Sequence, residues 1–336
     1  MEIELLQKDN EREWDEFVSG IDGSLFYYTL AWRNAIKDSY GHQYLYLLAR
    51  EKGKVRGILP VFLIENIFFG KKIVSLPFCS YGGILAKDKQ AQDALFNYLV
   101  SYIKKGKYNL FELRASSLIS GSEVDLSEFT FILDLKPGKD KLWSALDKKN
   151  RNQIRKSNKF DLRITVGNQY LKDFYTLYQK TMKKLGTPAH SIIFMENIIK
   201  LFPFQAKIIM LILGDTFIAG LFLIASQNTA YNLWAASDSR YLQTNLNNFL
   251  YWETIKYCVD SGLKFFDFGR SSNDSGTFHF KKQWGAKLIQ LYYHYFFREK
   301  RSFSIKKKYG KFSKIWSNLP IFITNLFGPK LRKYIP

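Results

Sequence analysis

The chain has 336 residues, of which 46% are apolar and 17% aromatic, enough for one large or two medium globular domains with packed cores. Its formal net charge of +20 predicts attraction to polyanions such as nucleic acid, anionic lipid headgroups or a phosphorylated substrate, without choosing among them. Only Cys79 and Cys258 occur, far apart and without paired spacing, which argues against a disulfide framework and a zinc site. A reducing compartment is expected.

No targeting or membrane-spanning segment is predicted. Residues 1–9 have neither the basic start nor the apolar core of a secretory signal. The most apolar window, residues 208–225, is interrupted by the turn signal Gly214-Asp215, which predicts two strands instead of one transmembrane helix. We therefore expect a cytoplasmic protein.

In chain order, the pattern of apolar residues and turn signals predicts the same series of elements twice. The first half is expected to contain a helix at 29–39, strands at 44–50, 55–64 and 72–76, a helix at 89–105 and a strand at 108–114. The second half is expected to contain helices at 171–185 and 191–201, strands at 206–213, 217–226 and 230–236, a helix at 246–259 and a strand at 264–268.

The two halves also share a local signal. Glu112 and Asp267 are each an acidic residue flanked by apolar ones, on the strand that follows the main helix of its half. With the matching element order, this predicts an α/β fold made of two copies of one domain, with mixed sheets flanked by helices.

Four segments are expected: an N-terminal domain at 1–140, a basic connecting helix at 141–165, a C-terminal domain at 166–297 and a basic aromatic tail at 298–336. Within the connecting helix, residues 147–159 carry six basic residues and one acidic residue. Leu142, Leu146 and Ile154 predict a narrow apolar side opposite a broad cationic one. This helix is interpreted either as lining a groove for phosphates or as a solvated linker.

The tail from residue 301 onward carries nine basic residues and no acidic one, interleaved with seven aromatic residues. That mixture is typical of a peripheral element at a membrane surface, with lysines at anionic headgroups and rings at the interface. The alternative is a tail packed across the two domains. Pro320 and Gly328-Pro329 are expected to break any long helix.

Polar residues concentrate where the predicted strand 264–268 ends. Asp267 is the single carboxylate in an aromatic run, and Gly269, Arg270, Ser271 and Ser272 follow it directly. Because ligands of open α/β sheets sit outside the carboxyl ends of strands, this loop is a candidate ligand site. The alternative is an ordinary connection between a strand and a helix.

A short helix is predicted at 277–284, with Ser275 or Thr277 as its N-cap and Gly285 just after its end. Helical spacing places Phe280 and Trp284 on the buried side, Lys281 at the rim of that side and Lys282 toward water. A lysine held between aromatic neighbours is a preorganised cation suited to a phosphate or a developing oxyanion. An exposed lysine on a solvated turn is the alternative.

Other chemistry is weakly signalled. The four histidines are scattered, without a metalloprotease or serine-hydrolase pattern, so no metal site is predicted. His279 lies within the central motif and is a secondary candidate for moving a proton near neutral pH. The backbone N–H groups of Tyr81, Gly82 and Gly83 form a second candidate anion site.

Three sequence runs together carry a resemblance to a known family. They are Asp267-Phe268-Gly269-Arg270-Ser271, the pattern Gly276-x-x-x-Phe280-Lys281-x-x-Trp284-Gly285, and Leu185-Gly186-Thr187-Pro188 upstream. They resemble the FemAB-like transferases, nearest to the subgroup associated with exosortase and exopolysaccharide systems. The resemblance covers most of the chain, including 143–159, 315–320 and 325–329, and implies two tandem GNAT-type domains.

The resemblance implies transfer of an acyl or aminoacyl group to an amine. This reaction needs an oriented ester donor, stabilisation of a tetrahedral oxyanion and a route for the amine proton. In the family, the lysine of the F-K motif contacts substrate phosphate and assists transfer, which implies a catalytic Lys281. Arg270 would add positive charge, and Asp267 would hold Arg270 or accept the proton. The residues expected to bind substrate are Ser271, Ser272, Phe280, Trp284, His279, Tyr81, Gly82, Gly83 and Lys37, the last a loose match to a substrate-binding lysine of the family.

The chain departs from the family in two respects. Residues 240–245 stand where the family has a glycine-containing turn that binds acetyl-CoA. No segment is long enough for the inserted coiled-coil arm associated with tRNA binding. Whether the donor is acyl-CoA or aminoacyl-tRNA therefore stays open, tRNA is not favoured, and no cofactor is predicted.

The expected function is an N-acyl or aminoacyl transferase acting in the cytoplasm, at the inner face of the membrane. It would modify an amino group of a cell-envelope polysaccharide or glycan precursor, bound as a phosphorylated or lipid-linked sugar. One alternative is a peptidoglycan bridge-forming transferase that uses aminoacyl-tRNA. Another is a non-catalytic module that binds RNA or a membrane surface, which charge alone supports.

Overall fold

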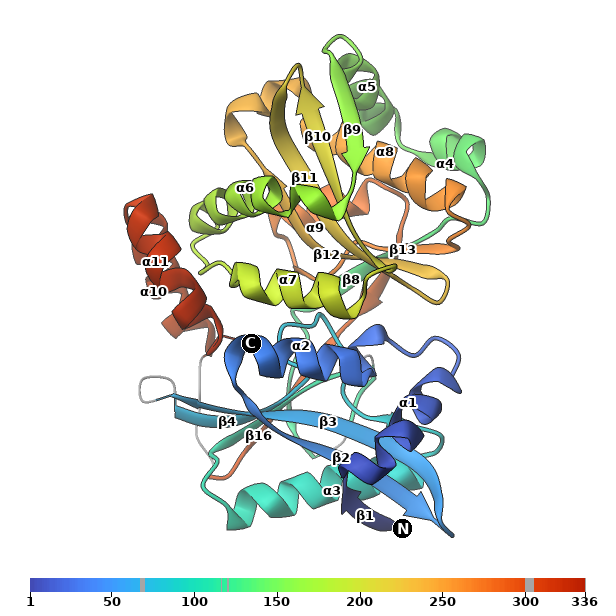
Figure 1. Cartoon of the computed structure of the whole chain (residues 1–336), viewed down its shortest axis with the longest axis vertical. Coiled ribbons are helices and arrows are strands. Elements are labelled where there is room, and N and C mark those ends of the chain that lie inside the picture. The colour runs from blue at the N-terminus through green and yellow to red at the C-terminus, as the bar shows by residue number, and fades with distance from the viewer. Residues whose placement is uncertain (67–69, 116, 120, 300–304, 336) are drawn as a thin grey trace. The chain divides into compact units, whose positions relative to one another are not determined.

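The computed structural model describes residues 1–66, 70–115, 117–119, 121–299 and 305–335, and the chain divides into two compact units (Figure 1). Unit 1 comprises Met1–Glu128, Gln290–Phe303 and Lys333–Pro336, and unit 2 comprises Phe129–Ile289 and Ser304–Arg332. Each unit contains one sheet flanked by helices, which confirms the predicted α/β class.

Unit 1 is built on an eight-stranded sheet in which β4 and β6 pair in parallel. Its strands, in spatial order, are β1 (Glu2–Leu5), β2 (Gln43–Glu51), β3 (Lys54–Asn66), β4 (Gly70–Ser75), β6 (Leu110–Ala115), β16 (Tyr292–Phe297) and β7 (Glu123–Asp125), with β5 (Leu85–Ala86) paired to β3 beside this row.

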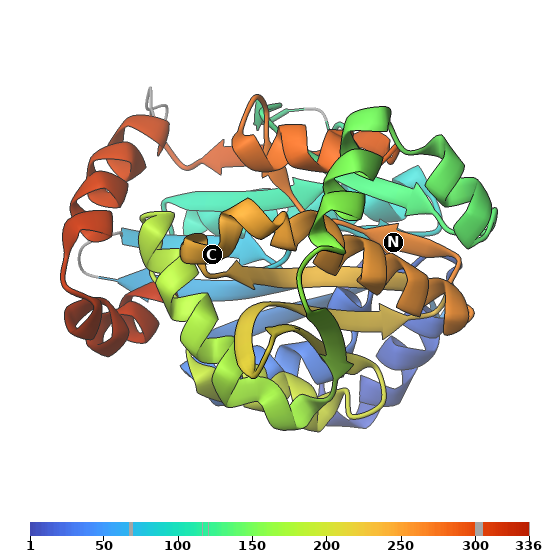
Figure 2. The ribbon, with the colours of Figure 1, turned by 90° about the horizontal axis from the view of Figure 1, so that it is seen from above.

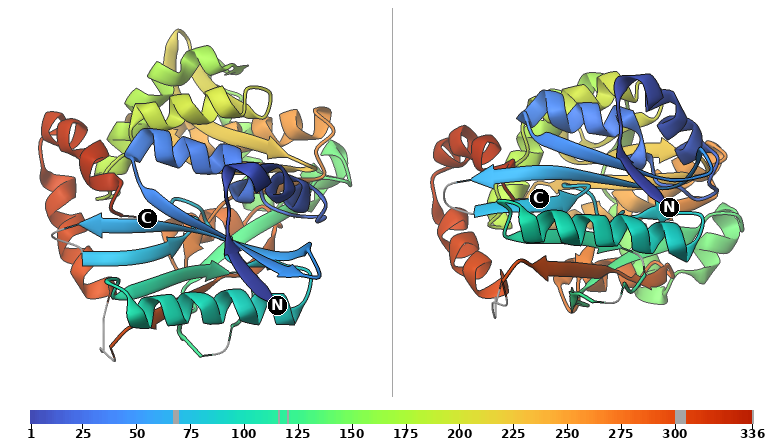
Figure 3. Two further views of the ribbon diagram at one scale, coloured as in Figure 1. Left: turned by 60° about the horizontal axis from the view of Figure 1, so that its bottom comes forward. Right: turned by 90° about the horizontal axis from the view of Figure 1, so that it is seen from below.

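Helix α3 (Lys89–Lys105) covers one face of this sheet, and α1 (Glu11–Ser19) and α2 (Leu30–Tyr40) lie on the other (Figure 3). The side chain of Asp88 caps α3 by accepting the N–H of Ala91. Leu95, Leu99 and Ile103 follow at helical spacing and are fully buried against the sheet. The core of unit 1 thus follows from an ordinary amphipathic pattern.

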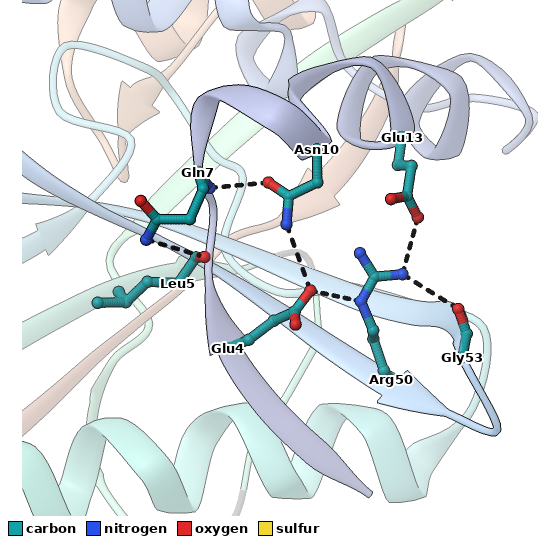
Figure 4. Close-up of polar contacts among 7 residues, drawn as sticks. All are labelled: Glu4, Leu5, Gln7, Asn10, Glu13, Arg50 and Gly53. Atoms are coloured by element: carbon teal, nitrogen blue, oxygen red, sulfur yellow. Dashed lines mark hydrogen bonds and ion pairs between the residues drawn. The ribbon is translucent and has the colours of Figure 1, made fainter.

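The first strand is fastened to the edge of this sheet by Arg50 of β2 (Figure 4). Its guanidinium bonds to Glu4 of β1, to Glu13 of α1 at 2.7 Å and to the carbonyl of Gly53 at 3.1 Å. One largely buried cation therefore joins a strand, a helix and a turn.

Unit 2 also has an eight-stranded sheet, in which β12 and β13 pair in parallel. Its strands, in spatial order, are β14 (Ser271–Ser272), β8 (Glu128–Asp134), β13 (Phe265–Asp267), β12 (Thr229–Ser237), β11 (Thr216–Ser226), β10 (Ala206–Leu213) and β9 (Leu162–Val166), with β15 (Lys287–Gln290) paired to β8.

Helices cover both faces of the unit 2 sheet (Figure 2). On one side lie α6 (Leu171–Lys184) and α7 (Ile192–Leu201), and on the other α4 (Lys139–Ala145), α5 (Lys148–Ser157) and α8 (Leu246–Asp260). Alternate residues of β10 supply the two cores. Ile209 and Leu211 pack in the cluster with α8, while Ile208 and Met210 are buried on the opposite face.

The register of the parallel pairs confirms the predicted duplication. In unit 1 the three pairs between β4 and β6 end at Val74 opposite Glu112. In unit 2 the three pairs between β12 and β13 end at Tyr231 opposite Asp267. The two acidic residues that matched in sequence thus occupy the same place in two sheets of similar order.

The units divide the chain differently from the four segments expected from the sequence. Strand β8, the basic helix α5 and β9 belong to unit 2, and β16 returns to unit 1 to pair with β6 and β7. Sequence patterns locate elements but do not tell which distant strand completes a sheet.

The tail forms two helices of unit 2, α10 (Ile305–Asn318) and α11 (Ile321–Arg332). Helix α10 ends just before Pro320, as expected, but α11 continues through Gly328-Pro329, so the expectation that this pair breaks a helix was wrong. A Cβ on Gly328 would lie only 3.4 Å from the backbone nitrogen of Ala189, so glycine allows close packing here. Within the part of the chain that the structure describes, no helix is both long and apolar enough to cross a membrane.

Candidate functional site

Strand β13 is much shorter than its parallel neighbour β12. Among the described residues, they pair only from Thr229 to Tyr231 and from Phe265 to Asp267, while β12 continues to Ser237. A register irregularity in β12 lies at the same place, because Phe222 and Leu223 of β11 pair with Trp234 and Asn232. From Asn232 onward, β12 therefore has no described strand partner on the side of β13, and this stretch lies beyond the carboxyl end of β13.

Three buried polar groups in this part of unit 2 have no hydrogen-bond partner among the described residues. They are Asn232 Oδ1, Ser271 Oγ and Trp284 Nε1. Buried polar atoms are normally paired, so such a set signals a site for a polar ligand or for ordered water. The amide nitrogen of Asn232 is engaged, since it donates to the hydroxyl of Tyr251 on α8 at 2.8 Å.

Asp267 is buried and accepts two hydrogen bonds through Oδ1. The hydroxyl of Thr130 on β8 donates at 2.6 Å, and the backbone N–H of Gly269 donates at 2.8 Å. Gly269 has a φ of 73°, a conformation that favours glycine and lets the chain turn sharply after the strand. The carboxylate thus fixes the start of the loop that was predicted to carry the site.

Lys281 belongs to helix α9 (Gly276–Lys282) and is buried. The sequence had placed it at the rim of the buried side of this helix. Its Nζ donates to the carbonyl oxygens of Gly269 and Arg270 at 2.8 and 2.9 Å. Helix α9 begins at Ser275, one of the two predicted N-caps, because Ser275 Oγ accepts the N–H of Phe278. The motif lysine therefore holds the turn between Asp267 and Ser271 in place.

Aromatic rings surround this turn on the side of α8. The ring of Tyr251 lies 5.6 Å from that of Phe268, 5.1 Å from that of Phe280 and 6.0 Å from that of Trp284, between centroids. On β12, burial raises the pKa of Tyr231 to about 12, and the nearby charge of Asp267 adds to this shift. Burial also raises the pKa of Tyr251, so both tyrosines stay protonated near neutral pH.

The loop before α8 is not a glycine turn. Residues Ser239–Thr244 form a 3-10 helix, and Asn245, with a φ of 54°, precedes the first turn of α8. In that turn, Asn248 donates to the side-chain oxygens of Asn150 and Gln153 on α5, at 2.9 and 3.1 Å. The basic helix is thus tied to the amino end of α8.

The other predicted site residues of unit 2 have different surroundings. The side chains of Arg270, Ser272 and His279 are exposed, and Lys282 points to solvent as expected. Ser271, Trp284 and Lys281 are buried, and Phe280 is partly buried. The structure therefore gathers the predicted residues around one turn, and their catalytic and binding roles stay predictions.

The predicted residues of unit 1 form a separate set. Lys37 is exposed on α2. The N–H of Gly82 donates to the carbonyl of Arg114, and a Cβ on Gly83, whose φ is 93°, would lie 2.8 Å from that carbonyl oxygen. These glycines allow a close approach to β6, which accounts for them without an anion. Substrate binding by Lys37, Tyr81, Gly82 and Gly83 stays a prediction.

Sequence reasoning missed Asn232, Tyr251 and Thr130. An available signal was the single amide in the otherwise apolar strand around Asn232, since polar residues in such runs need a partner. Thr130 carries no comparable local signal. Within the described residues, no group of three or more His, Cys, Asp or Glu side chains is placed to hold a metal ion.

Comparison with known proteins classifies this part of the chain. Residues 146–282 match the family model described as an acetyltransferase (GNAT) domain, and these residues lie within unit 2. In the comparison with curated proteins, nothing matches the chain.

Several solved structures share the fold of almost the whole chain. The crystal structure of FemX superposes with a TM-score of 0.66 at 16% identity, covering 87% of this chain and 97% of that one. A tandem GNAT protein from the clavulanic acid biosynthesis pathway gives 0.58 at 10% identity, covering 90% and 100%. L-PGS from Bacillus licheniformis gives 0.57 at 11% identity, covering 94% and 99%.

These matches confirm the expected fold of two tandem GNAT-like domains. At such low identities the structural likeness concerns the fold alone, and the family model adds the class of chemistry. Residues 146–282 thus match a GNAT-type acetyltransferase domain, and the described chain has the fold of tandem GNAT proteins.

Proposed function

We propose that this chain is a FemAB-like enzyme, which transfers an acyl or aminoacyl group to an amino group of a cell-envelope polysaccharide or glycan precursor. The observation that carries the proposal lies at the carboxyl end of β13, where Asn232 Oδ1 and Ser271 Oγ are buried without a hydrogen-bond partner among the described residues. Unpaired polar atoms at the end of a strand are suited to an oriented, partly polar substrate.

In the proposed reaction, the amine attacks the carbonyl carbon of the donor, and the donor's oxygen or sulfur leaves when the tetrahedral intermediate collapses. Ser271 Oγ would donate to the carbonyl oxygen as it gains negative charge. Asn232 Oδ1 would accept an N–H of the donor or of the attacking amine, which orients it. Asp267 would take the proton that the amine releases.

Lys281 has a supporting role in this proposal. Its ammonium donates to two carbonyls of the turn that carries Ser271, so it would fix the distance between that hydroxyl and Asp267. A phosphate of the substrate would meet Arg270 first, because this side chain is exposed on the same turn. The phosphate-binding role that the family resemblance implies for Lys281 thus passes to Arg270.

The acceptor in this proposal is a phosphorylated or lipid-linked sugar handled at the inner face of the membrane. The net charge of +20 and the exposed Arg270 support a negatively charged substrate. Assignment to the exosortase-associated subgroup is part of the proposal and rests on the sequence motifs.

A second candidate function, peptidoglycan bridge formation from aminoacyl-tRNA, is favoured by helix α5. Lys148, Lys149, Arg155 and Lys156 on this helix are exposed, and no described ion pair involves them. Because α5 is bonded to the amino end of α8 through Asn248, a polyanionic donor bound there would lie near the proposed site.

The test is mass spectrometry of envelope glycans and lipid-linked precursors from cells with the wild-type gene, with the gene deleted, and with Lys281→Ala, Ser271→Ala or Lys282→Ala. We expect an acyl or aminoacyl mass to be missing after deletion, reduced in the first two variants and unchanged in Lys282→Ala, whose side chain is exposed. Identical spectra from wild-type and deletion cells would refute envelope transfer.

The donor is tested separately with purified protein. Reversal of charge by Lys148→Glu/Lys149→Glu should weaken binding of aminoacyl-tRNA by roughly tenfold or more if α5 contacts its phosphates. Equal binding by wild-type and variant protein, or no binding by either, would leave acyl-CoA as the donor to be tested.

A further inference from the structure

Helices α10 and α11 pack on the carboxyl end of α6, beside which they lie in Figures 1 and 2. Trp316 of α10 and Thr324 of α11 are buried. Lys183 at the end of α6 donates to the carbonyl of Ser317 at 2.9 Å. One side of the helix pair is thus part of unit 2.

Facing away from Thr324, helix α11 carries two exposed apolar side chains. In α11, Phe322 and Leu326 are four residues apart, and their side chains are 69% and 59% exposed. The buried Thr324 and Gly328 have the same spacing on the other face of the helix. Four more exposed apolar residues lie in α10, in α11 or beside them: Ile315, Ile321, Phe327 and Leu185.

A surface of this kind needs a partner that accepts apolar side chains. Five exposed apolar residues fall within the thirteen positions from Ile315 to Phe327, although isolated exposed ones are normal on any protein. Leu185 adjoins them, because its carbonyl accepts a hydrogen bond from Ser313 of α10 at 3.4 Å.

Positive charge frames this apolar face. Lys184, Lys314 and Lys330 are exposed, and none of them takes part in a described ion pair. The sequence from residue 301 to the end contains nine basic residues and no acidic one. A second copy of the chain would bring these like charges together, which disfavours self-association through this face.

From this arrangement we infer that α10 and α11 form a docking surface for an anionic lipid membrane. Phe322, Leu326 and Ile315 enter the boundary between headgroups and acyl chains, and Lys314 and Lys330 contact the lipid phosphates. The inference rests on the membrane-proximal acceptor of the proposed function and specifies the surface that brings the enzyme to it.

The experiment is co-sedimentation of the full chain with vesicles of phosphatidylcholine alone, or with phosphatidylglycerol added. We expect binding to the anionic vesicles, weakened by salt, and little binding to the neutral ones. Phe322→Ser/Leu326→Ser and Lys314→Glu/Lys330→Glu should each lower the bound fraction by about tenfold or more. Phe204→Ser is the matched control, because this ring is 85% exposed outside the surface, between α7 and β10, and it should bind as wild type.

Three results would overturn the inference. The first is no binding of wild-type protein to anionic vesicles, and the second is unchanged binding by both double variants. The third is a change from dimer to monomer in Phe322→Ser/Leu326→Ser with vesicle binding intact, which would assign the face to a second copy. The assay contains neither donor nor acceptor, so its failure is distinct from identical glycan spectra, which would refute the transferase alone.

Discussion

The two units place a carboxylate at the same position of similar sheets but surround it differently. In unit 1, Arg114 lies two residues after Glu112 and donates to its Oε1 from Nε and Nη2, at 2.9 and 2.6 Å. In unit 2, Asp267 Oδ1 accepts a hydroxyl and a backbone N–H instead. Glu112 is therefore paired with a buried cation on its own strand, whereas Asp267 binds Gly269 in the loop that follows its strand.

The polar groups near these two carboxylates also differ between the units: those in unit 1 are hydrogen-bonded within the sheet, and some of those in unit 2 are not. In unit 1, Ser75 Oγ accepts the N–H of Arg114 and Gly82 donates to its carbonyl, so the segment after β4 closes against β6. In unit 2, Asn232 and Ser271 keep buried polar atoms without a described partner. At this position unit 1 is closed by hydrogen bonds within its own sheet, whereas unit 2 carries the buried polar atoms on which the proposed function rests.

The largest difference is expected for activity. Asp267→Asn keeps the shape of the side chain but removes the proposed proton acceptor, so we expect transfer to fall by about 10²- to 10⁴-fold. The measurement is the amount of modified envelope precursor per folded protein, by mass spectrometry. Glu112→Gln, the same change in unit 1, should keep activity per folded protein. Equal losses in both variants would contradict the division of roles.

For stability, we expect the larger effect from the carboxylate of unit 1. Glu112→Ala leaves Arg114 buried without its carboxylate, which should lower the free energy of unfolding by about 3–5 kcal/mol in urea titrations. Removing both charges in Glu112→Ala/Arg114→Met should recover much of this loss. If the double variant were as unstable as the single one, the ion pair would not explain the cost.

Local rules were sufficient for much of this fold. The order of the main strands and helices, Ser275 as one of two candidate N-caps and the match of Glu112 with Asp267 followed from periodicity, capping and repetition, which depend on neighbours in sequence. The buried side of α9 was predicted less well, because its buried residues are Phe278 and Lys281, whereas Phe280 is partly buried and Trp284 lies after the helix. These features set where the candidate turn lies.

The partners at the site depend on distant contacts and were not predictable in the same way. Helical phase placed Lys281 beside buried rings, but its ammonium finds carbonyls eleven and twelve residues earlier in the chain. Thr130 meets Asp267 across 137 residues because β8 pairs with β13, and no local pattern specifies that pairing. The sequence therefore predicted where the loop after Asp267 lies, but not that Thr130 and Lys281 hold it in place through hydrogen bonds.

A smaller contrast concerns pH. Burial lowers the pKa of His190 in unit 2 well below its ordinary value, and the charge of Arg332 adds to this, while burial also lowers the pKa of His42 and His294 in unit 1. The unfolded chain takes up a proton below about pH 6.5 that each folded site resists, so the free energy of unfolding falls as pH falls.

A substitution at His190 measures how much unit 2 contributes to the change of unfolding free energy with pH. Between about pH 6.5 and pH 5, His190→Gln should reduce the loss of unfolding free energy by up to roughly 1.4 kcal/mol per pH unit. His279→Gln, a change at an exposed histidine of the same unit, is the control in urea titrations at each pH. An unchanged slope in His190→Gln would show that this histidine is not kept neutral by the fold.

The smallest effect compares two serines, one in each unit. Ser75→Ala removes a hydroxyl that accepts the N–H of Arg114, so the free energy of unfolding should fall by about 1 kcal/mol. Ser271→Ala removes a buried hydroxyl with no described partner, so stability should change by less than about 0.5 kcal/mol while transfer slows. A clear loss of stability in Ser271→Ala would mean that this hydroxyl serves the fold, which would remove the main contrast between the units. Unchanged stability with unchanged transfer would instead place the reacting groups away from this turn.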